Sequence, residues 1–143
     1  MKIVLFGGAG FIGEYLARTL QERSDCDVIV IDRDAQTMAQ DFNADVVIVL
    51  TQPNGPVRDI LLPVLSRATN VKKIIYLSTL LLYSNAPYAQ DEMAVPDPKT
   101  EYERNKYQEE LMLRETTERI GCQLCIARLS NVYGDVKNRG IIN

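Results

Sequence analysis

Short runs of β-branched and other apolar residues alternate along the chain with longer stretches in which apolar residues recur every three or four positions. The short runs show little polar alternation, which is typical of parallel strands buried on both faces. The longer stretches are typical of amphipathic helices. The pattern predicts strands at residues 2–6, 28–32, 46–50, 73–78 and 123–129, and helices at residues 11–23, 35–42, 57–68 and 100–120.

Several residues mark the ends of these helices. Asp34 precedes the second helix as a candidate N-cap, and Pro63 predicts a kink or a late start in the third. Thr100 is placed to cap the long fourth helix, and Gly121 to end it. Repeated β-α units of this kind predict a single α/β domain over residues 1–143, with a parallel sheet between helices and right-handed crossovers.

Composition narrows the possible functions. The chain has 143 residues, 24% of them charged, and a formal net charge of −3, which excludes a strongly basic nucleic-acid binder. It contains no histidine, so it cannot build a His-based triad, an imidazole base or a His-ligated metal site. The sequence shows no secretory signal and no apolar run long enough for a membrane span. We therefore expect a cytoplasmic protein.

The three cysteines are odd in number and show no framework spacing, which indicates reduced thiols. Cys122 and Cys125 form a C-x-x-C pair, but they fall in a predicted strand. Residues three apart on a strand point to opposite faces, so a shared metal or a disulfide is not favoured. We expect ordinary buried thiols and no metal site.

A glycine-rich loop joins the first strand to the first helix. Gly7, Gly10 and Gly13 fit G-x-x-G-x-x-G, and Gly8, Gly10 and Gly13 fit G-x-G-x-x-G. Glycines here allow a tight turn, the approach of backbone N–H groups to a diphosphate, and close packing of helix and strand. The helix N-terminus adds unpaired N–H groups and partial positive charge. The alternative is a glycine-rich turn that binds no ligand.

The end of the second strand supports the dinucleotide hypothesis. Asp32 follows Gly13 by 19 residues, where a carboxylate can accept both ribose hydroxyls and would repel a 2′-phosphate. This favours NAD. Arg33 could instead meet a phosphate, so NADP stays possible.

Tyr102 and Lys106 are four residues apart on one face of the fourth helix. Such a pair alone is common on surface helices. However, Ser78 and Thr79 end the fourth strand and Asn131 follows the fifth, and in an open parallel sheet these positions face the crevice that holds the phosphate loop. The pattern predicts a site there.

The motifs GGAGFIG, VIVIDRD, ADVVIVL, IIYLSTLLLY, YERNK and IARLSNVYG occur in this order and cover nearly all of the chain. In this respect the sequence resembles the N-terminal part of the extended short-chain dehydrogenase/reductases, the NAD-dependent epimerase/dehydratases that act on nucleotide sugars.

The resemblance implies a mechanism. Tyr102 would be the general acid/base on a sugar hydroxyl, and Thr79 would hydrogen-bond the same hydroxyl. Lys106 and the oxidised nicotinamide would stabilise the phenolate, and hydride would pass to the cofactor. The oxidised sugar would then be epimerised, dehydrated or reduced. The implied cofactor-binding residues are Gly7, Gly10, Phe11, Ile12, Gly13, Asp32, Arg33, Leu50, Thr51, Ser78, Tyr102 and Lys106, and the implied substrate-binding residues are Thr79 and Asn131. A structural ion pair between Lys106 and Glu110 is the alternative for that lysine.

The chain departs from the family pattern in two places. Only 13 positions separate Asp32 from Asp45, too few for another β-α unit. We therefore expect a Rossmann-like three-layer fold with about five strands in the order 2-1-3-4-5, the third family strand being deleted. Nine residues follow Gly134, so we also expect the C-terminal substrate domain of the family to be absent and the chain to be incomplete as a catalyst.

These features leave several functions open. The leading one is the NAD-binding domain of a nucleotide-sugar epimerase/dehydratase-like oxidoreductase. The alternatives are a non-catalytic dinucleotide-binding or interaction module, one subunit of a site that another chain completes, and a structural subunit that binds no dinucleotide. The resemblance also implies a homodimer through helices 57–68 and 100–120.

Overall fold

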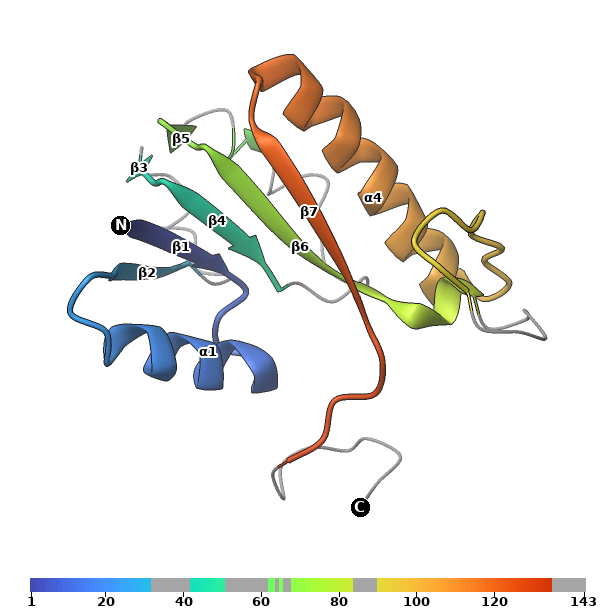
Figure 1. The fold of residues 1–143 in the computed structure, drawn as a ribbon, viewed down its shortest axis with the longest axis horizontal. Coiled ribbons are helices and arrows are strands. Elements are labelled where there is room, and N and C mark those ends of the chain that lie inside the picture. The colour runs from blue at the N-terminus through green and yellow to red at the C-terminus, as the bar shows by residue number, and fades with distance from the viewer. Residues whose placement is uncertain (32–41, 51–61, 64, 66–67, 84–89, 135–143) are drawn as a thin grey trace.

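Five parallel strands form one sheet with the order β2-β1-β4-β6-β7 (Figure 1). This computed structural model describes residues 1–31, 42–50, 62–63, 65, 68–83 and 90–134. The strands of the sheet are β1 (Lys2–Phe6), β2 (Asp27–Ile31), β4 (Val46–Val49), β6 (Lys73–Thr79) and β7 (Gln123–Leu129). The complete helical elements are α1 (Phe11–Gln21), the 3-10 helix η1 (Leu80–Tyr83) and α4 (Glu101–Ile120).

The strand order confirms the predicted 2-1-3-4-5 arrangement, so the fold is Rossmann-like. β4 pairs directly with β1 on one side and β6 on the other, which leaves β2 at the edge of the sheet. The first and last strands have the predicted bounds. The other three begin or end within one residue of the predicted positions, because short strands fray where the chain turns away from the sheet.

Three predicted helix ends are wrong. The first helix ends at Gln21, two residues before the predicted end. Phe42 belongs to the short strand β3 (Phe42–Asn43), and Ala68 begins β5 (Ala68–Thr69), with which β3 pairs in parallel. Phe42 packs against the core from this strand, so tertiary packing outweighs its local helical pattern. Residues 62–63 and 65 are helical, and Pro63 is one of them. The rest of these two predicted helices, including the cap expected at Asp34, lies outside the described residues.

The predicted boundaries of α4 are confirmed by its caps. The Thr100 hydroxyl accepts a hydrogen bond from the Glu103 amide at 3.2 Å, and the Glu103 carboxylate accepts one from the Thr100 amide at 3.1 Å. This reciprocal capping box satisfies donors that the first helical turn leaves open. At the other end Gly121 has φ = 73°, the left-handed conformation that ends helices and suits glycine.

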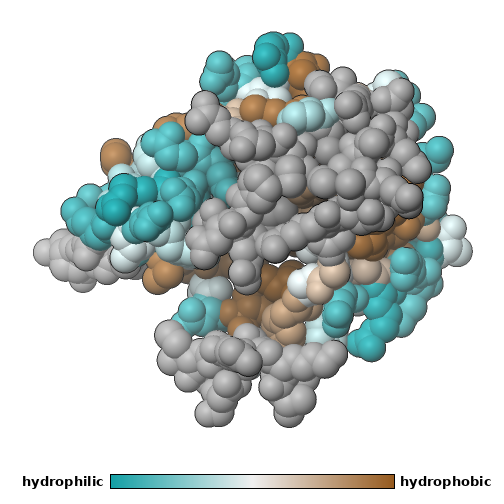
Figure 2. All heavy atoms as spheres, turned by 180° about the vertical axis from the view of Figure 1, so that it is seen from behind, coloured by the Kyte–Doolittle hydropathy of each residue, from teal (hydrophilic) through white to brown (hydrophobic). Residues whose placement is uncertain are grey.

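The core has two apolar clusters, one against each face of the sheet. Ala17 of α1 packs with Ile3, Leu5 and Ile48 on one face. Leu113 of α4 packs on the other face, in a cluster built mainly on β1, β4 and β6. Seen from behind, hydrophilic residues gather at two sides of the described surface, and hydrophobic residues are visible between them (Figure 2).

Asp45 joins three strands at the amino ends of the sheet, away from the glycine loop. Its carboxylate accepts hydrogen bonds from the Lys2 amide at 2.8 Å and from Lys72 Nζ at 2.6 Å. Its carbonyl accepts from the amides of Lys72 and Lys73. The hydrogen bond from Lys72 is the main reason that the pKa of Asp45 lies below its usual value.

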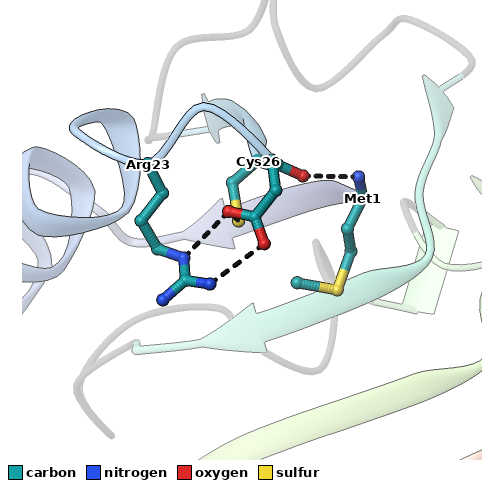
Figure 3. A network of polar contacts seen from close by, with 4 residues as sticks. Met1, Arg23 and Cys26 are labelled. Carbon is teal, nitrogen blue, oxygen red and sulfur yellow. Dashed lines mark hydrogen bonds and ion pairs between the residues drawn. The ribbon is translucent and has the colours of Figure 1, made fainter.

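The turn between α1 and β2 is held at the same end of the molecule (Figure 3). Arg23 donates two hydrogen bonds to the Asp25 carboxylate, at 3.0 and 2.9 Å, and the Met1 ammonium donates to the Asp25 carbonyl at 2.8 Å. The hydrogen bonds from Arg23 hold the pKa of Asp25 at about 2. The residues of this network are exposed, so they orient the turn without adding much stability.

Substitution of the α4 cap tests the contribution of the capping box. We expect Thr100→Ala to lower the free energy of unfolding by about 1 kcal/mol, because the Glu103 amide loses its acceptor. Thr100→Ser keeps the hydroxyl and should stay close to wild type. Urea unfolding followed by circular dichroism measures both, and equal stability of the alanine and serine variants would contradict the role assigned to the cap.

Candidate functional site

The glycine-rich loop is shaped by close backbone contacts. Gly7 has φ = 84°, and its amide donates to the Ile31 carbonyl at 2.9 Å. A Cβ added at Gly13 would lie 2.5 Å from the Gly8 carbonyl oxygen, and one at Gly8 would lie 2.6 Å from Val30 Cγ1. Glycine is therefore needed at these positions to pack the loop against α1 and β2.

Gly10 differs from these glycines because the space beside it is open. Among the atoms of the described residues, a Cβ added there would approach only the Gly7 carbonyl oxygen, at 3.7 Å. Gly10 is the N-cap of α1 and offers no side chain to accept from the first turn. The N–H groups of that turn and the positive end of the helix dipole therefore face a space with room for an anion. This arrangement fits a phosphate group.

The carboxyl ends of the parallel strands bring other predicted residues to the same edge of the sheet. The Leu50 amide donates to the Phe6 carbonyl at 2.8 Å, which keeps the end of β4 beside the start of the glycine loop. Thr79 ends β6, where it is buried and its hydroxyl accepts from the Leu81 amide at 3.2 Å. Asn131 follows β7 and is exposed.

Helix α4 begins at this edge and runs back along the sheet (Figure 1). Tyr102 lies in its first turn and is 41% exposed, whereas Lys106, one turn further, is only 4% exposed. The two predicted catalytic residues therefore meet different surroundings. Tyr102 is accessible from outside, and Lys106 lies beneath it between the helix and β6.

Contacts of three kinds hold Lys106 in this buried position: a hydrogen bond, a cation–π contact and an ion pair. Its Nζ donates to the Leu77 carbonyl at 2.9 Å, lies 4.7 Å from the centre of the Tyr76 ring, and forms an ion pair with Glu109 Oε2 at 3.7 Å. The ion pair in the structure is therefore with Glu109, while Glu110, the partner we considered from the sequence, interacts with the lysine electrostatically. Glu109 is one residue closer along the helix and also faces β6.

A phenol–carboxylate contact supports this lysine. The Tyr76 hydroxyl donates a hydrogen bond to Glu109 Oε2. Burial raises the pKa of Tyr76, so its hydroxyl stays a proton donor. Burial also raises the pKa of Glu109, and it lowers the pKa of Lys106, while the opposite charges of these two groups counteract both effects.

A second buried carboxylate lies next to the first. Glu110 is fully buried and accepts two hydrogen bonds from Arg128, at 2.9 and 2.6 Å, and one from Ser78 at 2.5 Å. The Arg128 guanidinium also lies 4.8 Å from the centre of the Tyr83 ring. Ser78, predicted to bind the cofactor, is engaged here with Glu110.

Sequence reasoning missed these supporting residues: Tyr76, Glu109 and Arg128. A signal was present, because two consecutive glutamates fall on the face of the fourth helix that also carries Lys106 and Leu113. Carboxylates on a buried face need partners from the strands beneath. The pattern does not say which strand residue meets which glutamate.

Beside Arg128 the surface is hollowed by a cavity of about 560 Å³ between η1, α4 and β7. Its lining residues include Tyr83, Arg114 and Ile126. It contains none of the predicted site residues, so it is separate from the edge that carries the glycine loop.

Three predicted residues, Asp32, Arg33 and Thr51, lie outside the described part of the chain. Within that part, no group of three potential metal-ligating side chains is present. Cys122 and Cys125 carry free thiols, and Cys125 is exposed rather than buried. None of the described helices is long and apolar enough to cross a membrane.

The strand order, the glycine loop and the Tyr-Lys helix together define a Rossmann-like α/β protein. The sequence model of the NAD dependent epimerase/dehydratase family matches residues 3–61 and 57–142. The chain belongs to this family. No curated protein matches it significantly.

Solved structures support the same fold. UDP-glucuronic acid 4-epimerase from Bacillus cereus in complex with NAD has a TM-score of 0.77 and 23% identity, over 94% of this chain and 58% of that chain. UDP-N-acetylglucosamine 4-epimerase from Bacillus cereus has a TM-score of 0.78 and 20% identity, over 97% and 64%. RMD from Pseudomonas aeruginosa complexed with NADPH has a TM-score of 0.78 and 17% identity, over 96% and 55%. The present chain therefore spans less than two thirds of the length of each.

Alanine substitutions at two positions of the glycine loop test which glycine is needed for folding and which one leaves room for a ligand. Gly13→Ala should lower the free energy of unfolding by about 1–3 kcal/mol, because its methyl group would overlap the Gly8 backbone. Gly10→Ala should leave stability close to wild type, because its methyl group has room. Thermal and urea unfolding measure the difference, and equal losses in both variants would contradict this account of the loop.

The buried Glu110–Arg128 pair allows a second stability test. We expect Arg128→Met to lower the free energy of unfolding by about 3 kcal/mol or more, because it leaves the buried Glu110 carboxylate without its counter-ion. The double variant Glu110→Gln with Arg128→Met removes both charges and should recover part of that loss. Urea unfolding of the single and double variants provides the comparison. A single variant as stable as wild type would show that the pair is not needed.

Proposed function

We propose that this chain is the NAD-binding part of a nucleotide-sugar epimerase or dehydratase, in which Tyr102 is the acid/base. The observation that carries the proposal is that the carboxyl ends of the strands lead both to a helix N-terminus at Gly10 without a side-chain cap and to the accessible Tyr102. Family membership supports the reaction class. The structural relatives bound to NAD and to NADPH support the cofactor, with NAD favoured by Asp32 and NADP kept possible by Arg33.

Different residues at this edge would bind different parts of the dinucleotide. The glycine loop and the first turn of α1 would bind the diphosphate through backbone N–H groups. The residues concerned are Gly7, Gly10, Phe11, Ile12 and Gly13. The proposed ribose contacts come from Asp32 at one end and from Lys106 at the other, with Leu50, Thr51 and Ser78 along the strand ends between them. When bound, the nicotinamide supplies a hydride acceptor.

On the substrate side Tyr102 would remove the proton of a sugar hydroxyl, and its exposure at the start of α4 gives that hydroxyl a path to it. The Thr79 hydroxyl would hold the same group, and Asn131 would contact the sugar or its phosphates. The positive charge of Lys106 would stabilise the Tyr102 phenolate while the proton is transferred.

We also propose that two copies of the chain pair through the segment at residues 57–68, predicted from the sequence as a helix, and through α4. Leu111 and Ile120 support this, because they are large apolar side chains that α4 exposes at 43% and 44%. A second copy would cover them.

A non-catalytic nucleotide-binding module is the second candidate. The observation that favours it is the engagement of the Lys106 ammonium by the Leu77 carbonyl and by Glu109, which directs it toward β6. If the chain is such a module, NAD binds, but a nucleotide sugar neither changes the affinity for NAD nor leads to NADH.

Titration calorimetry and absorbance at 340 nm distinguish these candidates. We expect saturable NAD binding by the wild-type chain and its loss in Gly10→Ala, because a methyl group would occupy the space of the phosphate. With NAD bound, a UDP-sugar should change the affinity for NAD. In any form of the protein that also carries a substrate-binding part, the UDP-sugar should produce NADH, and Tyr102→Phe should abolish NADH formation.

Each outcome has a distinct meaning. NAD binding without any effect of UDP-glucuronic acid, UDP-galactose or UDP-N-acetylglucosamine would favour the binding module. NADH formation by the Tyr102→Phe variant at the wild-type rate would exclude the acid/base role of that tyrosine. Failure to bind NAD or NADP would overturn the proposal as a whole.

A further inference from the structure

The surroundings of Lys106 are unusual for a lysine. The side chain is almost fully buried, and a protonated amine in such a place is costly unless an anion and hydrogen-bond acceptors surround it. The Leu77 carbonyl is a neutral acceptor and the Tyr76 ring offers only its π face. Glu109 supplies the negative charge that is in ion-pair contact.

Glu109 is itself held in place. Its carboxylate accepts the hydrogen bond of the Tyr76 hydroxyl from β6, and Glu109 is only 8% exposed. Its rotamer is therefore set from the strand as well as from the helix. The neighbouring Glu110 has other partners, Arg128 and Ser78, and so is less available to the lysine.

We propose that Glu109 is a positioning residue for Lys106: its carboxylate, fixed by the Tyr76 hydroxyl, is the counter-ion that holds the ammonium beneath the nucleotide site. This inference rests on the proposed function in so far as that site binds NAD. Lys106 would leave the Leu77 carbonyl for a ribose hydroxyl while Glu109 keeps its charge balanced. Tyr102, Lys106 and Glu109 thus act as a chain of three residues, and the Tyr76 hydroxyl holds Glu109 at the end of that chain.

The charged and titratable groups around Lys106 come from three elements. On α4 they are Tyr102, Glu109 and Glu110, on β6 Tyr76, and on β7 Arg128, which reaches Glu110. Burial lowers the pKa of Lys106, and Glu109 gives the largest opposing effect. Removing the Glu109 charge therefore lowers the lysine pKa further, so that the ammonium is lost at a lower pH than in the wild type.

Side-chain NMR of isotopically labelled lysine tests this directly, without cofactor. The Lys106 signal is assigned by its disappearance in Lys106→Arg and followed over pH 6 to 12. We expect the titration midpoint to fall in the order wild type, Tyr76→Phe, Glu109→Gln, because the phenylalanine variant loosens the carboxylate and the glutamine variant removes its charge. Glu115→Gln is the matched control, since Glu115 lies exposed on the same helix.

Calorimetry of NAD binding adds a second readout. In Glu109→Gln the affinity for NAD should match wild type at a pH where Lys106 is charged in both proteins. It should be about tenfold weaker at a higher pH where only the variant has lost that charge, the worth of one charged hydrogen bond. Glu115→Gln should follow the wild-type profile throughout. A purely structural role for Glu109 would lower the affinity equally at both pH values.

The two readouts separate the possible failures. A Lys106 midpoint that is unchanged in folded Glu109→Gln overturns the role of Glu109, whatever the chain binds. Absence of NAD binding in the wild type overturns the proposed function, while the midpoints still decide the role of Glu109. If Glu109→Gln does not fold, Tyr76→Phe decides, because it keeps the ring and both charges. A wild-type midpoint in that variant counts against the proposal.

Discussion

Four charged side chains lie in the contact between α4 and the sheet, and each is stable there only because a partner faces it. Glu109 meets Lys106 and the Tyr76 hydroxyl, and Glu110 meets Arg128. A buried carboxylate without a partner would cost several kcal/mol, so rotation or sliding of α4 is penalised by polar contacts as well as by lost packing. This constraint fixes how α4 lies on the sheet, and with it the position of Tyr102 in the first turn of that helix.

The sequence predicts the sheet well because its information is local. Buried strands such as β1 and β7 appear as continuous apolar runs, and the capping signals at Thr100 and Gly121 act within one helical turn. The ends of the middle helices could not be predicted in the same way. Phe42 and Ala68 meet each other only through β3 and β5, a pairing between residues far apart in the chain.

In the site, too, features set by local sequence could be predicted, whereas contacts between distant residues could not. The spacing of Gly7, Gly10 and Gly13 follows from backbone geometry, so the loop could be recognised without coordinates. The partner of Lys106 could not, because two adjacent glutamates fit a helical ion pair almost equally well. The choice is made by β6, where the Tyr76 hydroxyl accommodates one carboxylate and Ser78 the other. Side chains two positions apart on one strand share a face, so Tyr76 and Ser78 both face α4. They give the two adjacent glutamates different partners.

The Glu110–Arg128 pair also has a consequence for the order in which the protein is made. Glu110 lies on α4, and its guanidinium partner comes 18 residues later, on the last described strand. During synthesis α4 therefore leaves the ribosome before its most deeply buried carboxylate has a counter-ion. We expect α4 to dock fully against β6 only once β7 has been added and Arg128 has arrived, so that the addition of β7 and the closure of the helix over Lys106 are one event.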